Sequence, residues 1–268
     1  MTSPLLEVSR VSVHFGGVQA LADVDLALPD GSVFGIAGPN GSGKTTLLNV
    51  ISGVQRPARG HLRFDGVEYT NQASHRMPAL GVARTFQNVR LVPSLSIAEN
   101  VMVGLHHLTP EAGIWQTWAL LPKARRSERR TRHRAHELLA ELGIDHFAEQ
   151  RPQELPYGFQ RRVEIARALA SEPRLLLLDE PTAGMTPPDV QIITDLLRKV
   201  AASRRMSMIV VEHNVPFLGE LCSELAIMLA GRVLTQGTPA EVLADPRVVA
   251  AYLGKAEQDR SNRLARAT

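Results

Sequence analysis

Residues 33–46 read Val-Phe-Gly-Ile-Ala-Gly-Pro-Asn-Gly-Ser-Gly-Lys-Thr-Thr, an apolar stretch that runs into a glycine-rich turn and a lysine. This order is typical of a strand, a phosphate-binding loop and a helix. The glycines let successive backbone N–H groups face phosphate oxygens, Lys44 supplies a charge for the β- and γ-phosphates, and the Thr45 hydroxyl is placed to ligate magnesium. An ordinary glycine-rich turn is the alternative, but the apolar segments on both sides favour a P-loop. The nucleotide contacts expected from it are Gly38, Pro39, Asn40, Gly41, Ser42, Gly43, Lys44, Thr45 and Thr46.

Composition places the chain among ordinary globular proteins. It has 268 residues, of which 44% are hydrophobic and 21% charged, and its net charge of +3 is too small to indicate a nucleic-acid partner. The single cysteine, Cys222, cannot form an internal disulfide, so we expect a reducing compartment. The first residues lack the pattern of an export signal, and no segment approaches the roughly 20 apolar residues that span a bilayer. Any membrane association is therefore expected to come through a partner protein.

The order of expected elements predicts an α/β fold with a P-loop, RecA-like core. Up to about residue 85 the pattern indicates antiparallel strands beside the nucleotide-binding strand and helix, with strands at 6–15, 24–28 and 62–64. After residue 158, apolar strands alternate with helices, which indicates a mainly parallel sheet. We expect a core with its antiparallel β subdomain at 1–87 and 158–254, an inserted helical subdomain at 88–157, and a polar tail at 255–268.

The helical segment carries two features that the residues alone leave open. Arg125, Arg126 and four further arginines crowd residues 123–134, which is either a solvated helix face or a contact for anionic lipid or a partner. Trp115 and Trp118 lie in a linker, where they either pack under a loop or form a docking surface.

Two adjacent carboxylates follow the leucine run at 175–178. Asp179 and Glu180 then lie at the carboxyl end of a strand, where parallel sheets place ligand-contacting groups. We expect Asp179 to help hold Mg²⁺ and Glu180 to accept a proton from the attacking water. A helix-capping boundary is the alternative reading.

Two other side chains are candidates by position. His213 follows the apolar strand at 208–211, so we expect it to contact the γ-phosphate. Gln87 lies where the chain leaves the core for the helical segment, and it could touch the metal or the water; a surface glutamine is the alternative.

The segment Leu155-Pro156-Tyr157-Gly158-Phe159-Gln160 precedes a helix and resembles the signature motif of ABC-transporter ATPases. With it, six motifs stand in the family's order over about residues 6–254. The resemblance implies that Phe15 stacks on adenine, that Gln87 is the Q-loop glutamine that also reaches the metal, and that His213 is the switch histidine. It also implies that Leu155, Pro156, Tyr157, Gly158, Phe159 and Gln160 contact the ATP of a partner subunit.

A narrower resemblance is to the ATP-binding subunits of branched-chain amino acid uptake systems that carry a Tyr-Gly signature. It rests on Phe15-Gly16-Gly17, on the stretches at 83–91, 99–104 and 161–167, on Glu212-His213-Asn214, and on the ending at 251–254. Relatives that import urea or short amides share much of this pattern. The sequence therefore specifies the transported substrate less closely than the class of ATPase.

One position departs from the family. The usual signature serine is Pro156 here, and proline has neither a side-chain donor nor a backbone N–H. Gly158 and the helix start must then supply the anion contacts, and Phe159 also replaces a small or polar residue. The composite site built with this signature is expected to be the weaker of two, and a catalytically silent regulatory subunit is one alternative.

The resemblance implies an ATPase that uses ATP and Mg²⁺ and works as a homo- or heterodimer of ATP-binding subunits. Its further partners would be integral-membrane permease subunits and, indirectly, a periplasmic binding protein, with no nucleic acid. The expected location is the cytoplasmic face of a bacterial-type inner membrane, as a peripheral subunit. The alternatives are a urea or amide importer, a lipid or lipopolysaccharide exporter, and a non-transport ABC ATPase acting on DNA or ribosomes.

Overall fold

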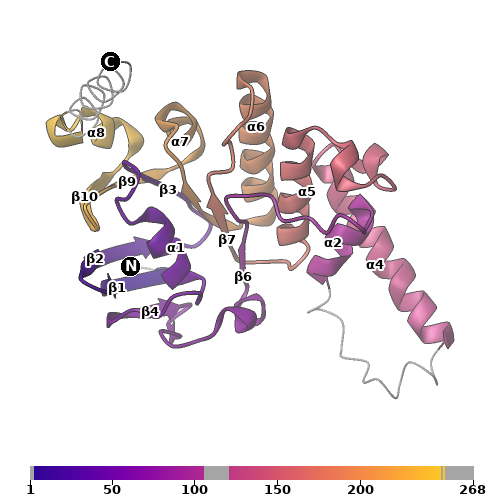
Figure 1. The fold of residues 1–268 in the computed structure, drawn as a ribbon, viewed down its shortest axis with the longest axis horizontal. Coiled ribbons are helices and arrows are strands. Elements are labelled where there is room, and N and C mark those ends of the chain that lie inside the picture. Colours follow the sequence, from indigo (N-terminus) through magenta and orange to yellow (C-terminus); the bar gives the residue numbers. More distant parts are fainter. Residues whose placement is uncertain (1–2, 106–120, 249, 251–268) are drawn as a thin grey trace. The chain divides into compact units, whose positions relative to one another are not determined.

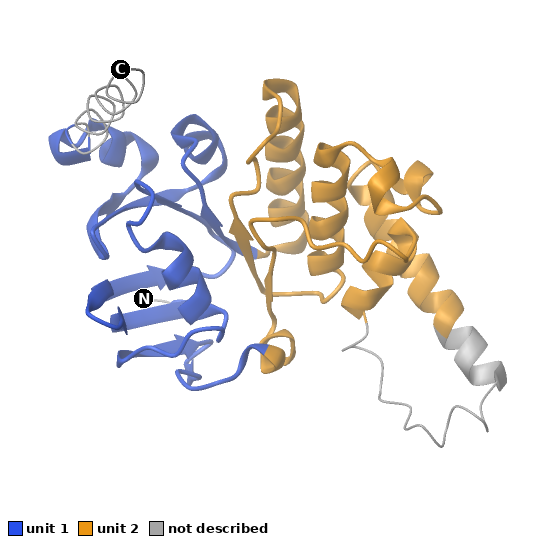
Figure 2. Ribbon diagram, in the orientation of Figure 1, with its two compact units in different colours: residues 1–74, 207–268 blue, residues 75–206 orange. Residues whose placement is uncertain are grey.

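The computed structural model describes residues 3–105, 121–248 and 250, and for 121–127 the backbone alone. Trp115, Trp118 and the polar tail expected at 255–268 lie outside the described residues. The described chain divides into two compact units, residues 1–74 with 207–268 and residues 75–206 (Figure 2). No helix in the described part is both long and apolar enough to cross a bilayer.

The first unit contains an antiparallel sheet in the order β2-β1-β4-β5 (Figure 1). These strands are β1 (Leu6–Phe15), β2 (Val18–Leu28), β4 (Arg59–Phe64) and β5 (Val67–Glu68). Along β2, buried Val24 and Leu26 alternate with exposed Asp25 and Ala27, which is the alternation of a sheet with one covered face. The expected antiparallel β subdomain is confirmed.

A second set of strands in this unit holds the P-loop. In the order β10-β9-β3-β8, strand β3 (Val33–Ala37) pairs in parallel with both neighbours. The other strands are β8 (Ser207–Val211), β9 (Glu224–Leu229) and β10 (Arg232–Gly237), and the helices are α1 (Lys44–Ile51), α7 (Val215–Leu221) and α8 (Pro239–Ala244). Buried Phe34, Ile36 and Val210 have no solvent exposure, as a central strand requires.

The second unit pairs β6 (Val82–Arg84) in parallel with β7 (Leu175–Asp179). Its helices are α2 (Ile97–Leu105), α4 (Leu121–Glu141), α5 (Tyr157–Leu169) and α6 (Pro187–Arg204), and α2, α4 and α5 pack on one another. Helix α2 begins as its sequence indicates: Ser96 N–H donates to Glu99 Oε2 (2.8 Å) and Glu99 N–H to Ser96 Oγ (3.2 Å). The α/β class with helical segment is thus confirmed, and helix α4 carries the basic stretch.

Two arginines of that basic stretch have acidic partners. Arg134 donates to Glu137 (2.8 Å) and to Glu172 (3.2 Å), and Arg132 lies 3.7 Å from Glu149. The hydrogen bond from Arg134 lowers the pKa of the Glu137 carboxyl. Part of this face is therefore paired within the protein.

Candidate functional site

The glycine-rich turn follows β3 directly and leads into α1. Gly38 has a φ of +151°, and a Cβ there would lie 2.2 Å from the backbone oxygen of Met228, so only glycine fits. Gly43 caps α1 with a φ of +104°. The amides at the start of α1 are left without helical partners and face the loop, which is the arrangement that binds anions.

Lys44 folds back over this turn. Its ammonium donates to the carbonyl oxygens of Gly38 (2.8 Å) and Pro39 (3.0 Å), and the side chain is buried. The buried Ser42 hydroxyl has no hydrogen-bond partner among the described residues. Thr45 is exposed in the first turn of α1, and Asn40 and Gly41 are exposed at the tip of the loop. An unsatisfied hydroxyl beside a lysine fits a phosphate group.

The same unit places two other predicted residues. Phe15 ends β1 with half of its surface exposed, so its ring is available to a flat ligand. His213 follows β8, and its side chain is 62% exposed. The buried Glu212 carboxylate accepts the backbone N–H of His213 (3.0 Å) and of Asn214 (3.4 Å), which fixes the backbone that carries the histidine.

The second unit brings Gln87 to Glu180, although they are 93 residues apart in sequence. Gln87 Nε2 donates to Glu180 Oε2 at 2.9 Å. Glu180 directly follows β7 and has a φ of +46°, a left-handed conformation that is uncommon for a residue with a side chain. The predicted water-activating carboxylate and the predicted Q-loop glutamine are therefore neighbours.

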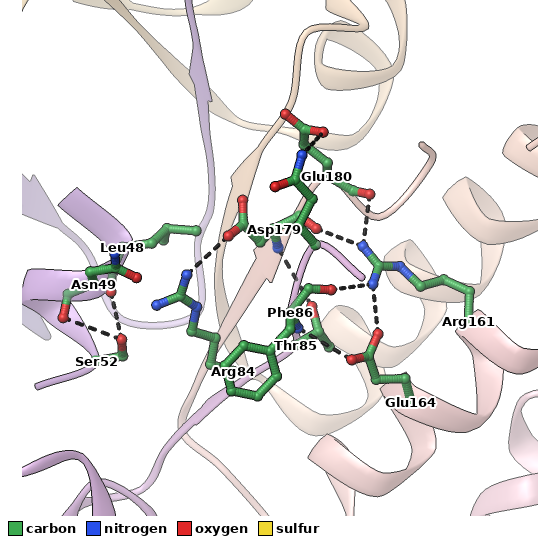
Figure 3. A network of polar contacts seen from close by, with 11 residues as sticks. Leu48, Asn49, Ser52, Arg84, Thr85, Phe86, Arg161, Glu164, Asp179 and Glu180 are labelled. Carbon is green, nitrogen blue, oxygen red and sulfur yellow. Dashed lines mark hydrogen bonds and ion pairs between the residues drawn. The ribbon is translucent and has the colours of Figure 1, made fainter. Parts of the chain in front are cut away.

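Asp179, the last residue of β7, is held by an arginine. Arg84 Nη2 donates to Asp179 Oδ2 at 2.9 Å, with the side chains 9% and 2% exposed (Figure 3). The other carboxylate oxygen, Oδ1, is buried and has no partner among the described residues. An unsatisfied buried carboxylate oxygen fits a metal ion or its water. Arg84 was not among the residues predicted for the site. Its position three residues before the predicted Gln87 could have indicated that it lies near Asp179.

The signature segment forms the start of α5 rather than a loop before it. Pro156 is the N-cap, with φ −55° and ψ 151°, and Tyr157–Gln160 make the first turn. The sequence predicted that this segment precedes the helix. A proline N-cap followed by Tyr157 and Gly158 is nevertheless compatible with a helix start, because the first amides need no helical partner.

Within that turn the side chains are differently placed. Tyr157 is exposed, while Phe159 packs edge-on against the ring of Phe147 (4.9 Å) and carries the guanidinium of Arg162 above it (4.9 Å). Gln160 Nε2 donates to the carbonyl oxygen of Leu155 (2.8 Å). Phe159 and Gln160 thus stabilise the first turn of α5 through contacts within the protein.

This chain is similar to ATP-binding proteins of ABC transporters over most of its length. The sequence profile of the family described as ABC transporter matches residues 21–183, and that of the branched-chain amino acid ATP-binding cassette transporter C-terminal region matches 232–258. The branched-chain amino acid transport ATP-binding protein BraF of Pseudomonas aeruginosa is 37% identical over 96% of this chain and its own full length. LivG of Escherichia coli K12, with the same described role, is 31% identical over 96% of this chain and its own full length.

Solved structures agree in fold. An ATP-binding cassette of an ABC transporter in its ADP conformation has a TM-score of 0.82 and 29% identity, covering 94% of this chain and all of that one. A dimeric cassette bound to ADP and phosphate in a post-hydrolysis state has a TM-score of 0.74 and 28% identity, covering 87% of this chain and 98% of that one. The P-loop, the Asp179-Glu180 strand end and the signature turn thus occur together in a chain that belongs to the ABC transporter ATP-binding family.

Proposed function

We propose that this chain is the ATP-hydrolysing subunit of an ABC importer for branched-chain or related amino acids. The observation that supports it most is full-length similarity to BraF, together with a sequence match to the branched-chain subfamily at the C-terminal end. Its site would lie at the cytoplasmic face of the membrane, beside permease subunits, a second ATP-binding subunit and, indirectly, a periplasmic binding protein. The segment 88–157 would be the part that faces the permease.

The residues take the following roles in this proposal. Backbone N–H groups of the 38–46 loop (Pro39 has none) and the ammonium of Lys44 bind the phosphates, Phe15 stacks on the adenine, and His213 contacts the γ-phosphate. Glu180 accepts the proton of the attacking water, and Gln87, hydrogen-bonded to it, orients that water. Tyr157 and Gly158, at the start of α5, contact the nucleotide held by the partner subunit.

Mg²⁺ would be held by Thr45, Gln87 and Asp179, and when bound it neutralises charge that develops on the phosphate oxygens. Asp179 Oδ1, which has no hydrogen-bond partner within the described part of the chain, supports this assignment from the second unit. Thr45, an exposed residue in the first turn of α1, supports it from the first unit.

The test is reconstitution of the complete transporter in proteoliposomes. We expect phosphate release that depends on the binding protein, together with uptake of leucine, isoleucine or valine. Uptake of urea or a short amide instead would change the proposed substrate class but would leave the proposed ATPase role unchanged. Cargo moved outward, or no phosphate release from the assembled complex with Mg²⁺ and ATP, would contradict the proposal.

A further inference from the structure

Arg161 has a burial that its position does not predict. It lies in the second turn of α5, yet its side chain is 1% exposed, and it is among the largest fully buried side chains of the described residues. A buried guanidinium is costly unless its donors are satisfied. Its partners therefore indicate what the residue does.

Those partners are backbone oxygens from two segments of the second unit. Nη2 donates to the carbonyl oxygens of Asp179 (2.6 Å) and Glu180 (2.7 Å), and Nη1 donates to that of Phe86 (Figure 3). Nε also reaches the carbonyl oxygen of Pro181 (3.4 Å). One planar group therefore touches both the end of β7 and the residue before Gln87.

Glu164, one helical turn along α5, completes the arrangement. Its Oε2 accepts from Arg161 Nη1 (2.6 Å) and its Oε1 accepts the backbone N–H of Phe86 (3.3 Å), with Arg167 4.0 Å away. The Arg161–Glu164 pair thus holds the N–H and the C=O of Phe86 at once. Both side chains are 1% exposed, so water does not compete for these bonds.

The residues that this pair anchors are those that carry the reaction in the proposed function. Glu180 is anchored through its own carbonyl, and Gln87 through the preceding residue, and the two side chains are hydrogen-bonded to each other at 2.9 Å. Glu180 also stands in a left-handed conformation, which persists only where its surroundings enforce it. Arg161 supplies that enforcement through three consecutive carbonyls.

Resting on that proposed function, we propose that Arg161, with Glu164, is a positioning residue for ATP hydrolysis. It fixes the backbone on both sides of the Gln87–Glu180 contact so that the carboxylate meets water in one orientation. P-loop residues 38–46, which bind the phosphates in the proposed function, belong to the other compact unit, so we expect a change at Arg161 to lower turnover more than ATP binding.

The test uses Arg161→Lys in the complete transporter, because lysine keeps the charge but cannot reach four carbonyls from one planar group. We expect kcat for ATP to fall at least tenfold while the KM for ATP changes less than twofold. Arg204→Lys is the matched control. Arg204 forms two hydrogen bonds to Glu141 (3.3 and 2.5 Å) in the same unit, and neither residue contacts Gln87 or Glu180 in the described structure. The kcat of this variant should stay within twofold of the wild-type value.

Hydrogen–deuterium exchange of the nucleotide-free subunit gives a readout that does not need activity. In Arg161→Lys, exchange should rise at 84–90 and 178–184 and stay unchanged at 33–51. The positioning role would be overturned if exchange rose throughout the protein or did not change. It would also be overturned if kcat fell without the two local rises, or if the two rises came without a fall in kcat. A wild-type complex that releases no phosphate would instead overturn the proposed function, whatever the exchange pattern.

Glu164→Gln keeps the test decisive if Arg161→Lys does not fold. Glu164 contacts Phe86 and not the 179–181 carbonyls. Exchange should therefore rise at 84–90 more than at 178–184. Equal rises, or none, would contradict the inferred division of contacts.

Discussion

At the residue scale, the chemistry depends on side chains that lie within a few ångströms of each other but far apart in sequence. Asp179 and Glu180 are neighbours in the chain, yet they have separate partners. Asp179 pairs with Arg84, and Glu180 with Gln87. Because β7 ends between them, one carboxylate stays buried in the strand and the next is partly exposed after it. Adjacent carboxylates in different environments suit different roles.

Replacing Glu180 with glutamine keeps the shape but removes the base. We expect Glu180→Gln to bind ATP as the wild type does and to lose at least a hundredfold in hydrolysis, since general-base catalysis is worth about 10²–10⁴-fold. A closed dimer should accumulate with ATP, as seen by size-exclusion chromatography. Normal turnover would remove Glu180 from its proposed role.

Lys44 is tested by binding rather than by turnover. In Lys44→Ala the phosphates lose a charge-assisted donor, worth about 1.5–3 kcal/mol, so ATP affinity should fall at least tenfold. Isothermal titration calorimetry measures this directly. Unchanged affinity would contradict the P-loop assignment, and an unchanged circular dichroism spectrum would show that the fold was retained.

At the element scale, helix packing depends on where a side chain is absent. Helices α2 and α5 approach so closely at Gly104 that a Cβ there would lie 2.1 Å from the carbonyl oxygen of Arg167. The obstacle is backbone, which cannot rotate away. The position therefore requires glycine although it lies in a helix, where glycine is otherwise unfavourable.

Gly104→Ala should accordingly lower stability by about 1–3 kcal/mol, the cost of overpacking. Gly219→Ala is the matched control, because Gly219 also lies in a helix, α7, with no atom within 4 Å of the added carbon. That substitution should leave the melting temperature unchanged or raise it slightly. Equal effects from the two variants in a thermal melt would rule out the steric reason.

Pro156 is tested by restoring a capping side chain. It occupies the N-cap of α5, where no side chain accepts a hydrogen bond from the helix. In Pro156→Ser the hydroxyl can cap the helix, for about 0.5–2 kcal/mol, and can reach a phosphate on the partner subunit. We expect a higher melting temperature and equal or faster ATP hydrolysis. A large loss of turnover would show that the proline is itself required.

At the scale of the whole molecule, a single thiol reports on opening of the first unit. Cys222, at the end of α7, is 8% exposed, and burial raises the pKa of its thiol to about 12. At pH 8 about one thiol in ten thousand is then ionised in the folded protein, against about a quarter in an unfolded chain. Alkylation therefore requires the protein to open.

We expect iodoacetamide to label Cys222 slowly in the native protein and rapidly in urea. ATP at a hundred times its dissociation constant should slow native labelling about a hundredfold, because ligand binding stabilises the folded state by about 2.7 kcal/mol. Mass spectrometry of the labelled peptide measures the rate. Rapid labelling of the folded protein would contradict the burial, and a rate insensitive to ATP would separate Cys222 from the nucleotide-binding unit.

The sequence alone determined the strand–turn–helix of the P-loop, the strand end at Asp179 and Glu180, and the α/β class, because each rests on contiguous residues with a local physical cause. It placed the signature segment before a helix rather than in the first turn of α5, because a helix start that contains proline and glycine carries a weak periodic signal.

Only the tertiary structure decided which charges meet. The sequence shows Arg84, Arg161 and Glu164 as charged residues in ordinary positions. Nothing local indicates that they are buried against Asp179, both backbone polar groups of Phe86 and the carbonyl of Glu180. The physical reason is that burial and pairing depend on segments 18–95 residues apart, brought together by the packing of β6, β7 and α5.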